Sequence, residues 1–176
     1  MTSALDEKRA ILLTHYGVAN AYSAVAAQHT VKGVDLSDCV ALLENESGGR
    51  NVFGGEGTAC PRIWREGEVT QARYTYYKLR RNLGMSPNGV GPTQLTDPTL
   101  QKLAEKRGGC WIPLHNMEIG FGYFSELVEL HGIWGGAMRY NGSGPDAEAY
   151  ATRLVDRASV WHARFMRTGL AGVISL

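Results

Sequence analysis

The feature that most constrains the fold is a series of helix-forming segments, each with its own start and stop signals. The clearest is residues 97–109, where Asp97 stands at the N-cap, Pro98 in the first turn and Gly108 just past the end. Apolar residues at helical spacing and similar end signals predict further helices over residues 3–17, 18–28, 35–47, 70–83, 113–131 and 145–165. Strand signals are weak, so we predict a mainly α fold with at most a small β-hairpin region within residues 50–69.

Length and composition indicate one globular domain spanning residues 1–176. Apolar residues make up 44% of the chain and charged residues 20%, which excludes disordered and membrane classes. The net charge of +1 argues against nucleic-acid binding, which usually needs a large basic excess. No stretch approaches the roughly 20 apolar residues that span a bilayer, and the N-terminus lacks the apolar region of a signal peptide. We therefore expect a cytosolic product that does not insert into membranes.

Cysteine and histidine usage predicts neither a disulfide framework nor a metal site. Cys39, Cys60 and Cys110 are widely and irregularly spaced, unlike a zinc pair or a secreted scaffold. The five histidines lack metal-ligand spacing. We expect no metal and no cofactor. A cysteine peptidase would need Cys60 with His115, but Cys60 precedes a proline and so has no helix dipole to activate it.

The helix over residues 35–47 ends in two acids that a helical wheel separates. Glu46 follows Leu43 by three residues and Leu42 by four, so it ends the apolar face. Glu44 lies about 200° away, near the edge of that face. Burial and the negative end of the helix dipole both favour the protonated form of a carboxyl. A protonated carboxylic acid can act as a general acid, so we predict this role for Glu46.

Four segments, at residues 44–51, 89–96, 116–127 and 137–157, carry the motifs Glu-Ser-Gly-Gly, Gly-Pro-Thr-Gln-Leu-Thr, Asn-x-x-x-Gly and Tyr-Asn-Gly-Ser-Gly. Together they resemble the lysozyme superfamily, especially goose-type lysozymes and soluble lytic transglycosylases. "ENESGGRN", 44–51, resembles the Glu-Ser motif at the active site of these enzymes. "GVGPTQLT", 89–96, looks like their glycine-rich cleft wall. "AMRYNGSGPDAEAYATRLVDR", 137–157, is similar to their Ala-x-x-Tyr-Asn-x-Gly element and the helix that follows it. "NMEIGFGYFSEL", 116–127, resembles the Asn-x-x-x-Gly helix before that element.

A second resemblance is to glycoside hydrolase family 19, the chitinases and related phage endolysins. Gln94 follows Glu46 by 48 residues, a longer spacing than in lytic transglycosylases, and both "ESGG" and "GPTQLT" fit family 19. That family has a second glutamate about twenty residues after the first, where Glu66 and Glu68 fall. The Tyr-Asn element in 137–157 instead favours the transglycosylase side.

Both resemblances imply a single α+β lysozyme-like catalytic domain, built as a helical bundle around a central helix. Residues 1–30 would form N-terminal helices, and residues 35–167 the catalytic core. The implied activity is a peptidoglycan-degrading glycosidase that cuts the β-1,4 bond between N-acetylmuramic acid and N-acetylglucosamine as a hydrolase. The alternatives are a lytic transglycosylase that gives 1,6-anhydromuramic products, and a non-catalytic glycan-binding module. Preference for chitin or peptidoglycan stays open.

The resemblance also assigns roles to individual side chains. Glu46 would protonate the glycosidic oxygen, and in a hydrolase a second carboxylate would activate water. Our first choice for the second carboxylate is Glu68, followed by Glu66 and Glu56. Expected substrate-binding residues are Ser47, Gln94, Tyr140 and Asn141. Gln94 would bond an acetamido group, Tyr140 would hold Glu46 through its hydroxyl, and Asn141 would bind the glycan or only stop a helix.

The expected setting is that of a phage endolysin's catalytic domain. Such a protein stays in the host cytoplasm until a holin releases it to the cell wall. Its partners would be peptidoglycan glycan strands, and we expect it to be a monomer. Whether it is joined to other lysin domains in a longer chain is left open. The stretch "RYTYYKLRR", 73–81, could stack on sugars and bind stem carboxylates, bind nucleic acid, or simply form a solvated helix with Tyr74 and Tyr77 inward.

Overall fold

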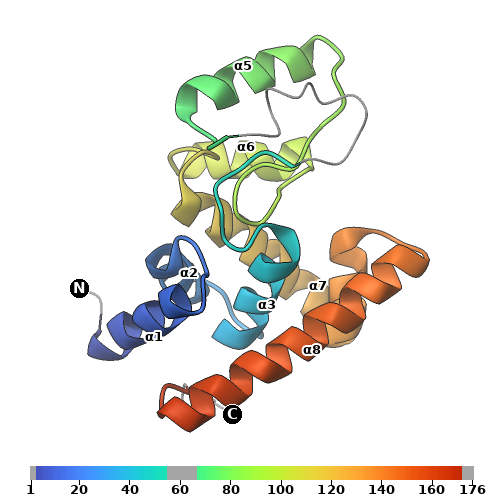
Figure 1. The fold of residues 1–176 in the computed structure, drawn as a ribbon. Coiled ribbons are helices and arrows are strands. Elements are labelled where there is room, and N and C mark those ends of the chain that lie inside the picture. The colour runs from blue at the N-terminus through green and yellow to red at the C-terminus, as the bar shows by residue number, and fades with distance from the viewer. Residues whose placement is uncertain (1–2, 55–66, 172–176) are drawn as a thin grey trace.

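The computed structural model describes residues 3–54 and 67–171, and these residues are mainly helical (Figure 1). The helices are α1 (Ala4–His15), α2 (Ala21–Gln28), α3 (Leu36–Glu46), α5 (Gln71–Asn82), α6 (Pro98–Arg107), α7 (Pro113–Asn141) and α8 (Pro145–Thr168). Extended pairing in the described residues is limited to two isolated bridges, Val52 with Glu68 and Phe53 with Val90. The predicted mainly α fold with a small β region is confirmed. No helix in these two ranges has the length and apolar character needed to cross a bilayer.

Four of the described helices start at a capping side chain. Ser3 and Asp35 each form a capping box with the residue three positions later, while Thr70 and Asp97 accept a hydrogen bond from a backbone N–H of the first turn. Asp35 is therefore the cap of α3.

Two helix boundaries differ from those predicted. The second helix begins at Ala21 instead of Val18, because Asn20 adopts a left-handed conformation (φ 53°). Gly132 interrupts α7 as predicted for a helix stop (φ 69°), but the chain resumes a helix at once and continues to Asn141. The apolar periodicity across this break was too short to reveal a second helical segment.

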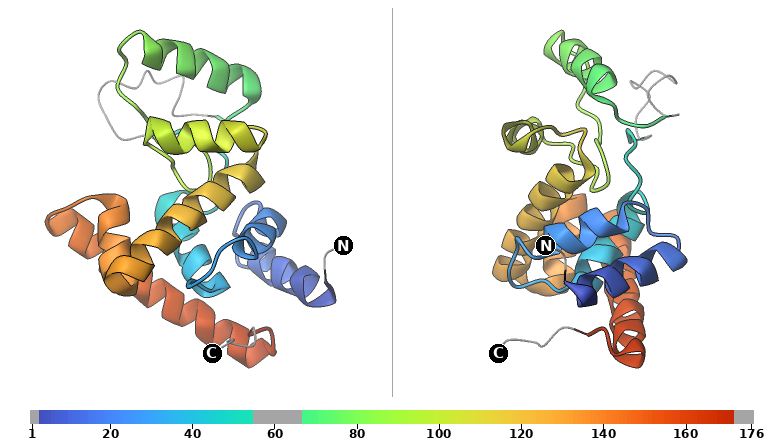
Figure 2. Two further views of the ribbon diagram at one scale, coloured as in Figure 1. Left: turned by 180° about the vertical axis from the view of Figure 1, so that it is seen from behind. Right: turned by 90° about the vertical axis from the view of Figure 1, so that its left-hand side faces the viewer.

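α3 is the buried centre of the larger part of the molecule (Figures 1 and 2). It packs along α8 and also against α2, while α7 packs on α2, α6 and α8. Residues 39–43 of α3 are fully buried in the main core. α5 and α6 form the other end of the molecule, around a second core. That core contains Phe53, Tyr74, Tyr77, Val90, Leu95 and Cys110.

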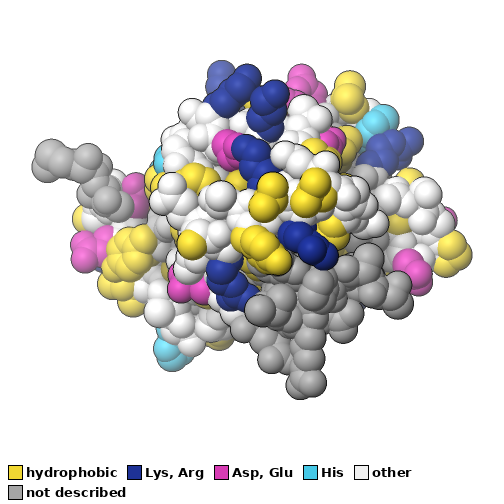
Figure 3. All heavy atoms as spheres, turned by 90° about the horizontal axis from the view of Figure 1, so that it is seen from above, with side chains coloured by type: hydrophobic (Ala, Val, Ile, Leu, Met, Phe, Trp, Pro, Cys, Tyr) yellow, Lys and Arg dark blue, Asp and Glu magenta, His cyan; other side chains and the backbone are white. Residues whose placement is uncertain are grey.

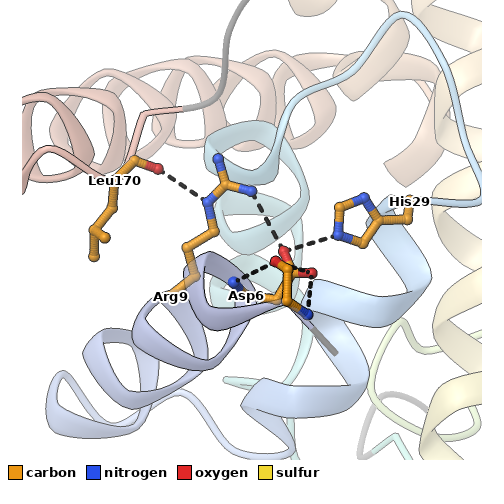
Figure 4. Close-up of polar contacts among 5 residues, drawn as sticks. Asp6, Arg9, His29 and Leu170 are labelled. Atoms are coloured by element: carbon orange, nitrogen blue, oxygen red, sulfur yellow. Dashed lines mark hydrogen bonds and ion pairs between the residues drawn. The ribbon is translucent and has the colours of Figure 1, made fainter. Parts of the chain in front are cut away.

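A partly buried polar cluster ties α1 to α2 and to the end of α8 (Figure 4). The Asp6 carboxylate accepts hydrogen bonds from the backbone N–H and the hydroxyl of Ser3 and lies 2.9 Å from Nε2 of His29. It is also 3.6 Å from Arg9, whose Nε donates to the carbonyl oxygen of Leu170 at 2.9 Å. Burial raises the pKa of Asp6, but the bonds from Ser3 and the bond and charge of His29 outweigh it and lower the pKa below its ordinary value.

Asp6→Asn is expected to destabilise the protein by about 1–2 kcal/mol at pH 7, because charge-assisted hydrogen bonds are lost. A lowered folded-state pKa gives stability that is present above the ordinary carboxyl pKa of about 3.9 and lost as the pH falls through the folded value. The difference between variant and wild type should therefore shrink below about pH 4. Urea unfolding at pH 7, 4 and 3 measures it, with exposed Glu7→Gln as the control. A difference independent of pH would contradict the ion-pair account.

Candidate active site

A cleft of about 1040 Å³ opens beside the end of α3. Its described lining comes from residues 45–47, 50, 52–54, 87–89, 94, 96, 140–141, 143, 146, 149–150 and 153. The end of α3 and the first turns of α8 form one wall. The 52–54 strand segment and the 87–96 loop form the other wall. Most of the lining side chains are polar.

Glu46, the last residue of α3, places its half-buried carboxyl in this cleft. The hydroxyl of Tyr150 donates a hydrogen bond to its Oε1. Tyr150 is itself 4% exposed, and burial together with the negative charge of Glu46 raises its pKa far above the ordinary value. The Tyr150 hydroxyl therefore keeps its proton and remains a donor that fixes the orientation of Glu46.

Glu44 faces a different environment from Glu46. Its carboxylate lies 3.9 Å from Nε of Arg157, and it is not part of the described cleft lining. Between the two acids, Asn45 donates to the backbone carbonyl of Tyr150 at 3.1 Å and accepts from Arg157 at 2.5 Å. Asn45 thus holds the end of α3 against α8 through these two hydrogen bonds. Of the two acids, only Glu46 is part of the described cleft lining.

Ser47 uses its hydroxyl inside the protein. It is buried, and its Oγ donates to the carbonyl oxygen of Pro92 at 2.6 Å. Gly49, two residues after Ser47, has φ 78°. It lies so close to Ala19 that an added Cβ would be 2.2 Å from the Ala19 carbonyl oxygen. The serine and glycine of the Glu-Ser-Gly-Gly sequence therefore join α3 to the opposite wall and to the α1–α2 loop.

Gln94 is held in a strained backbone conformation with its amide fixed. Its φ is 50°, a left-handed value that costs a non-glycine residue about 1 kcal/mol or more. Its Nε2 donates to the carbonyls of Val52 at 3.0 Å and Gly91 at 2.7 Å. A Cβ on Gly54 or Gly89 would lie 2.6 or 2.5 Å from its Oε1. Within the described residues no donor bonds this oxygen, so the cleft wall has an oriented acceptor.

The loop that carries Gln94 is seated on two residues of α7. Asn116, fully buried, donates to the Val90 carbonyl at 2.8 Å and accepts from the backbone N–H and hydroxyl of Thr93 at 3.0 and 2.8 Å. One turn later, Gly120 leaves room for Thr93, since a Cβ there would lie 2.2 Å from Thr93 Oγ1. The Asn-x-x-x-Gly pattern noted in the sequence thus positions the loop.

Gly120→Ala is expected to displace the loop and cost about 1–3 kcal/mol of stability, because the new methyl group would overlap Thr93. Gly122→Ala is the matched control on the same helix, where an added Cβ meets nothing within 4 Å. It should be neutral or stabilising by up to about 1 kcal/mol through helix propensity. Thermal unfolding of both variants measures the difference, and equal melting temperatures would refute the seating role.

The structure gives Tyr140 a different contact from the one expected. Its hydroxyl donates to the Thr93 carbonyl at 2.8 Å, and its ring packs against Tyr123 and Phe124. The hydroxyl that holds Glu46 belongs to Tyr150 instead. Tyr140 lines the same cleft as Glu46, and burial and the charge of Glu46 raise the pKa of Tyr140 well above its ordinary value. Asn141 ends α7 and is exposed at the cleft edge.

Of the expected second carboxylates, only Glu68 lies in the described residues. It is exposed, its backbone bridges Val52, and it is not part of the described cleft lining. Glu56 and Glu66 lie outside the described residues. The other carboxylate on the described lining is Asp146 in the first turn of α8. Sequence reasoning missed it because an acid there is already explained by the helix dipole.

Under the general-acid role predicted for Glu46, Tyr150→Phe is expected to lower kcat about tenfold with little change in KM, because the variant keeps the buried ring but loses one hydrogen bond to that carboxyl. Steady-state rates of wall degradation measure this effect. Tyr22→Phe, which alters a tyrosine that is 54% exposed, is the control. An unchanged kcat for Tyr150→Phe would show that its hydroxyl does not position Glu46.

The described residues contain no group of three or more His, Cys, Asp or Glu side chains arranged to hold a metal ion. The thiols of Cys39 and Cys110 are buried, and burial raises the pKa of both, that of Cys110 to about 12. Cys60 lies outside the described residues. No family model matches the sequence, and neither a curated protein nor a solved structure matches it. A functional assignment therefore rests on the cleft and on the sequence motifs that line it.

Proposed function

We propose that this protein is a lysozyme-type glycosidase that cleaves the β-1,4 bond between N-acetylmuramic acid and N-acetylglucosamine, with Glu46 as general acid. One observation carries the proposal: the Glu46 carboxyl is half-buried in a large polar cleft and is oriented by a buried tyrosine. A positioned carboxylic acid beside a long polar groove is what glycosidic bond cleavage requires.

In this mechanism Glu46 protonates the glycosidic oxygen, and positive charge develops on the sugar ring. Oε1 of Gln94 would accept a hydrogen bond from the N–H of an acetamido group, since both Gln94 amide protons are already donated to backbone carbonyls. This contact would fix the register of the sugar against Glu46. A few fixed polar groups of this kind set ligand orientation in many sites.

For a hydrolase, a second carboxylate about 6.5–9.5 Å from the first would activate water. The exposed position of Glu68 outside the described lining argues against our first choice and leaves Glu56, Glu66 and now Asp146 as candidates. The second candidate function is a lytic transglycosylase, in which the 6-hydroxyl of the muramic sugar attacks instead of water. It is favoured by the fact that Glu46 is the one half-buried carboxyl on the described lining.

Mass spectrometry of the products released from purified cell walls tests the proposal. A hydrolase gives muropeptides with a reducing end, whereas a transglycosylase gives anhydro products that are lighter by one water. Binding to walls without any product would leave only the glycan-binding module and overturn the enzyme assignment. We place this activity in a phage endolysin that acts as a monomer on the wall after a holin has released it from the host cytoplasm.

A further inference from the structure

Two arginines line the same wall of the cleft as Glu46. Arg50 follows the acid by four residues, and its Nε donates to the Ser47 carbonyl at 2.7 Å, which directs the side chain along the end of α3. Arg153 lies on α8 one turn after Tyr150, the residue that holds Glu46. Three residues of helix correspond to about 4.5 Å along the axis, so Arg153 lies about one turn from Tyr150, and both arginines line the cleft that contains Glu46.

Neither guanidinium forms an ion pair with a carboxylate of the described residues. Both arginines are exposed. Arg157, one turn further along α8, behaves differently, since it contacts Glu44 and Asn45. The only polar contact of Arg50 in the described residues uses Nε, which leaves its two terminal nitrogens as donors. Arginine donors of this kind match the geometry of a carboxylate.

The opposite wall adds a favourable long-range field for an anionic ligand. Residues 67–112, which include the 87–96 loop, contain seven Lys or Arg and three Asp or Glu, a net charge of +4. Since the whole chain carries +1, the remaining residues carry −3. Figure 3 looks down on this end and shows several Lys and Arg side chains spread over it. A positive lobe beside a cleft raises the local concentration of anions.

We propose that Arg50 and Arg153 form an anion subsite that binds a carboxylate carried by the glycan beside the bond to be cut. The proposal rests on the proposed function and names its substrate class. In an aminosugar polymer of the bacterial wall, each muramic residue carries a lactyl group that is free or extended by a peptide, and both forms have carboxylates. Chitin has none. The subsite therefore selects muramic-acid strands over uncharged chitin of the same linkage.

Isothermal titration calorimetry in the Glu46→Gln background tests binding without turnover. The ligands are a soluble peptidoglycan fragment with intact peptides, the same fragment after an amidase has removed the peptides, and a chitin oligosaccharide of equal length. The parent should prefer the peptidoglycan fragments by about tenfold or more, the range of a charge-assisted pair. Arg50→Gln and Arg153→Gln should each remove most of that preference and leave chitin binding within about twofold.

Arg167→Gln is the matched control, because it removes an exposed cation from the last turn of the same helix, away from the described cleft lining. It should keep the preference. If the amidase-treated fragment still binds more tightly than chitin, the subsite binds the lactyl carboxylate. If that difference disappears, the subsite binds a carboxylate of the peptide. Equal affinity of the parent for chitin and peptidoglycan, or equal losses on both ligands in the arginine variants, would overturn the subsite. Failure of the wild type to cut any wall would overturn only the glycosidase assignment.

Discussion

Replacing Glu46 by Gln is expected to reduce product release from purified walls by at least about 10²–10⁴-fold, the usual contribution of general-acid catalysis. Glutamine is nearly isosteric, and its amide oxygen can still accept the hydrogen bond that Tyr150 donates to Oε1. The variant should therefore fold normally and bind glycan, but it cannot donate a proton to the glycosidic oxygen. Reducing-end and muropeptide assays measure the rate, and circular dichroism with thermal unfolding checks the fold.

Glu44→Gln is the matched control for this experiment. It changes an acid two residues away that contacts Arg157 at 3.9 Å and lies outside the described cleft lining. Partly exposed ion pairs contribute about 1 kcal/mol or less, so activity should stay within about twofold of wild type. A Glu44→Gln variant without activity beside an active Glu46→Gln variant would reverse the assignment of the acid.

The helices could be predicted from the sequence because their signals are local. Capping residues such as Ser3, Thr70 and Asp97 stand within a few positions of the groups that they bond, and periodicity marks the buried face. The misplaced start of α2 depends on Asn20, whose amide donates to the Gly49 carbonyl across the loop. That contact joins residues 29 positions apart, which no local pattern reveals.

The candidate site was predictable only in part, for the same reason. Spacing within α3 was enough to separate Glu46 from Glu44. The hydrogen bond from Tyr150 to Glu46 was not predictable, because the two residues are 104 positions apart. In the sequence Tyr150 is explained as one of the residues on the buried apolar face of α8. Both Tyr140 and Tyr150 carry hydroxyls near the cleft, and only the crossing of α3, α7 and α8 determines which one reaches the acid.

Asn116→Ala is expected to cost about 3–5 kcal/mol of stability. The variant leaves the buried Thr93 N–H without a partner. It also removes one hydrogen bond each from the Val90 carbonyl, which keeps the Leu95 N–H at 3.1 Å, and from the Thr93 hydroxyl, which keeps the backbone carbonyl of residue 116 at 3.3 Å. Each of these two lost bonds is worth about 1 kcal/mol. Each unsatisfied buried group costs about 1–3 kcal/mol, and a domain of this size has only about 5–15 kcal/mol in total. Urea unfolding at pH 7 measures the loss.

The same substitution should also impair activity in the molecules that remain folded, since the seated loop carries Gln94 and the carbonyl of Thr93 receives the Tyr140 hydroxyl. We expect KM to rise more than kcat falls, because Gln94 would bind substrate and does not transfer a proton. Asn82→Ala, at an exposed position at the end of α5, is the control and should change stability by less than about 0.5 kcal/mol. A loss below about 1 kcal/mol for Asn116→Ala would mean that water or a shifted backbone satisfies the loop, and that the Asn-x-x-x-Gly pattern does not hold the cleft wall in place.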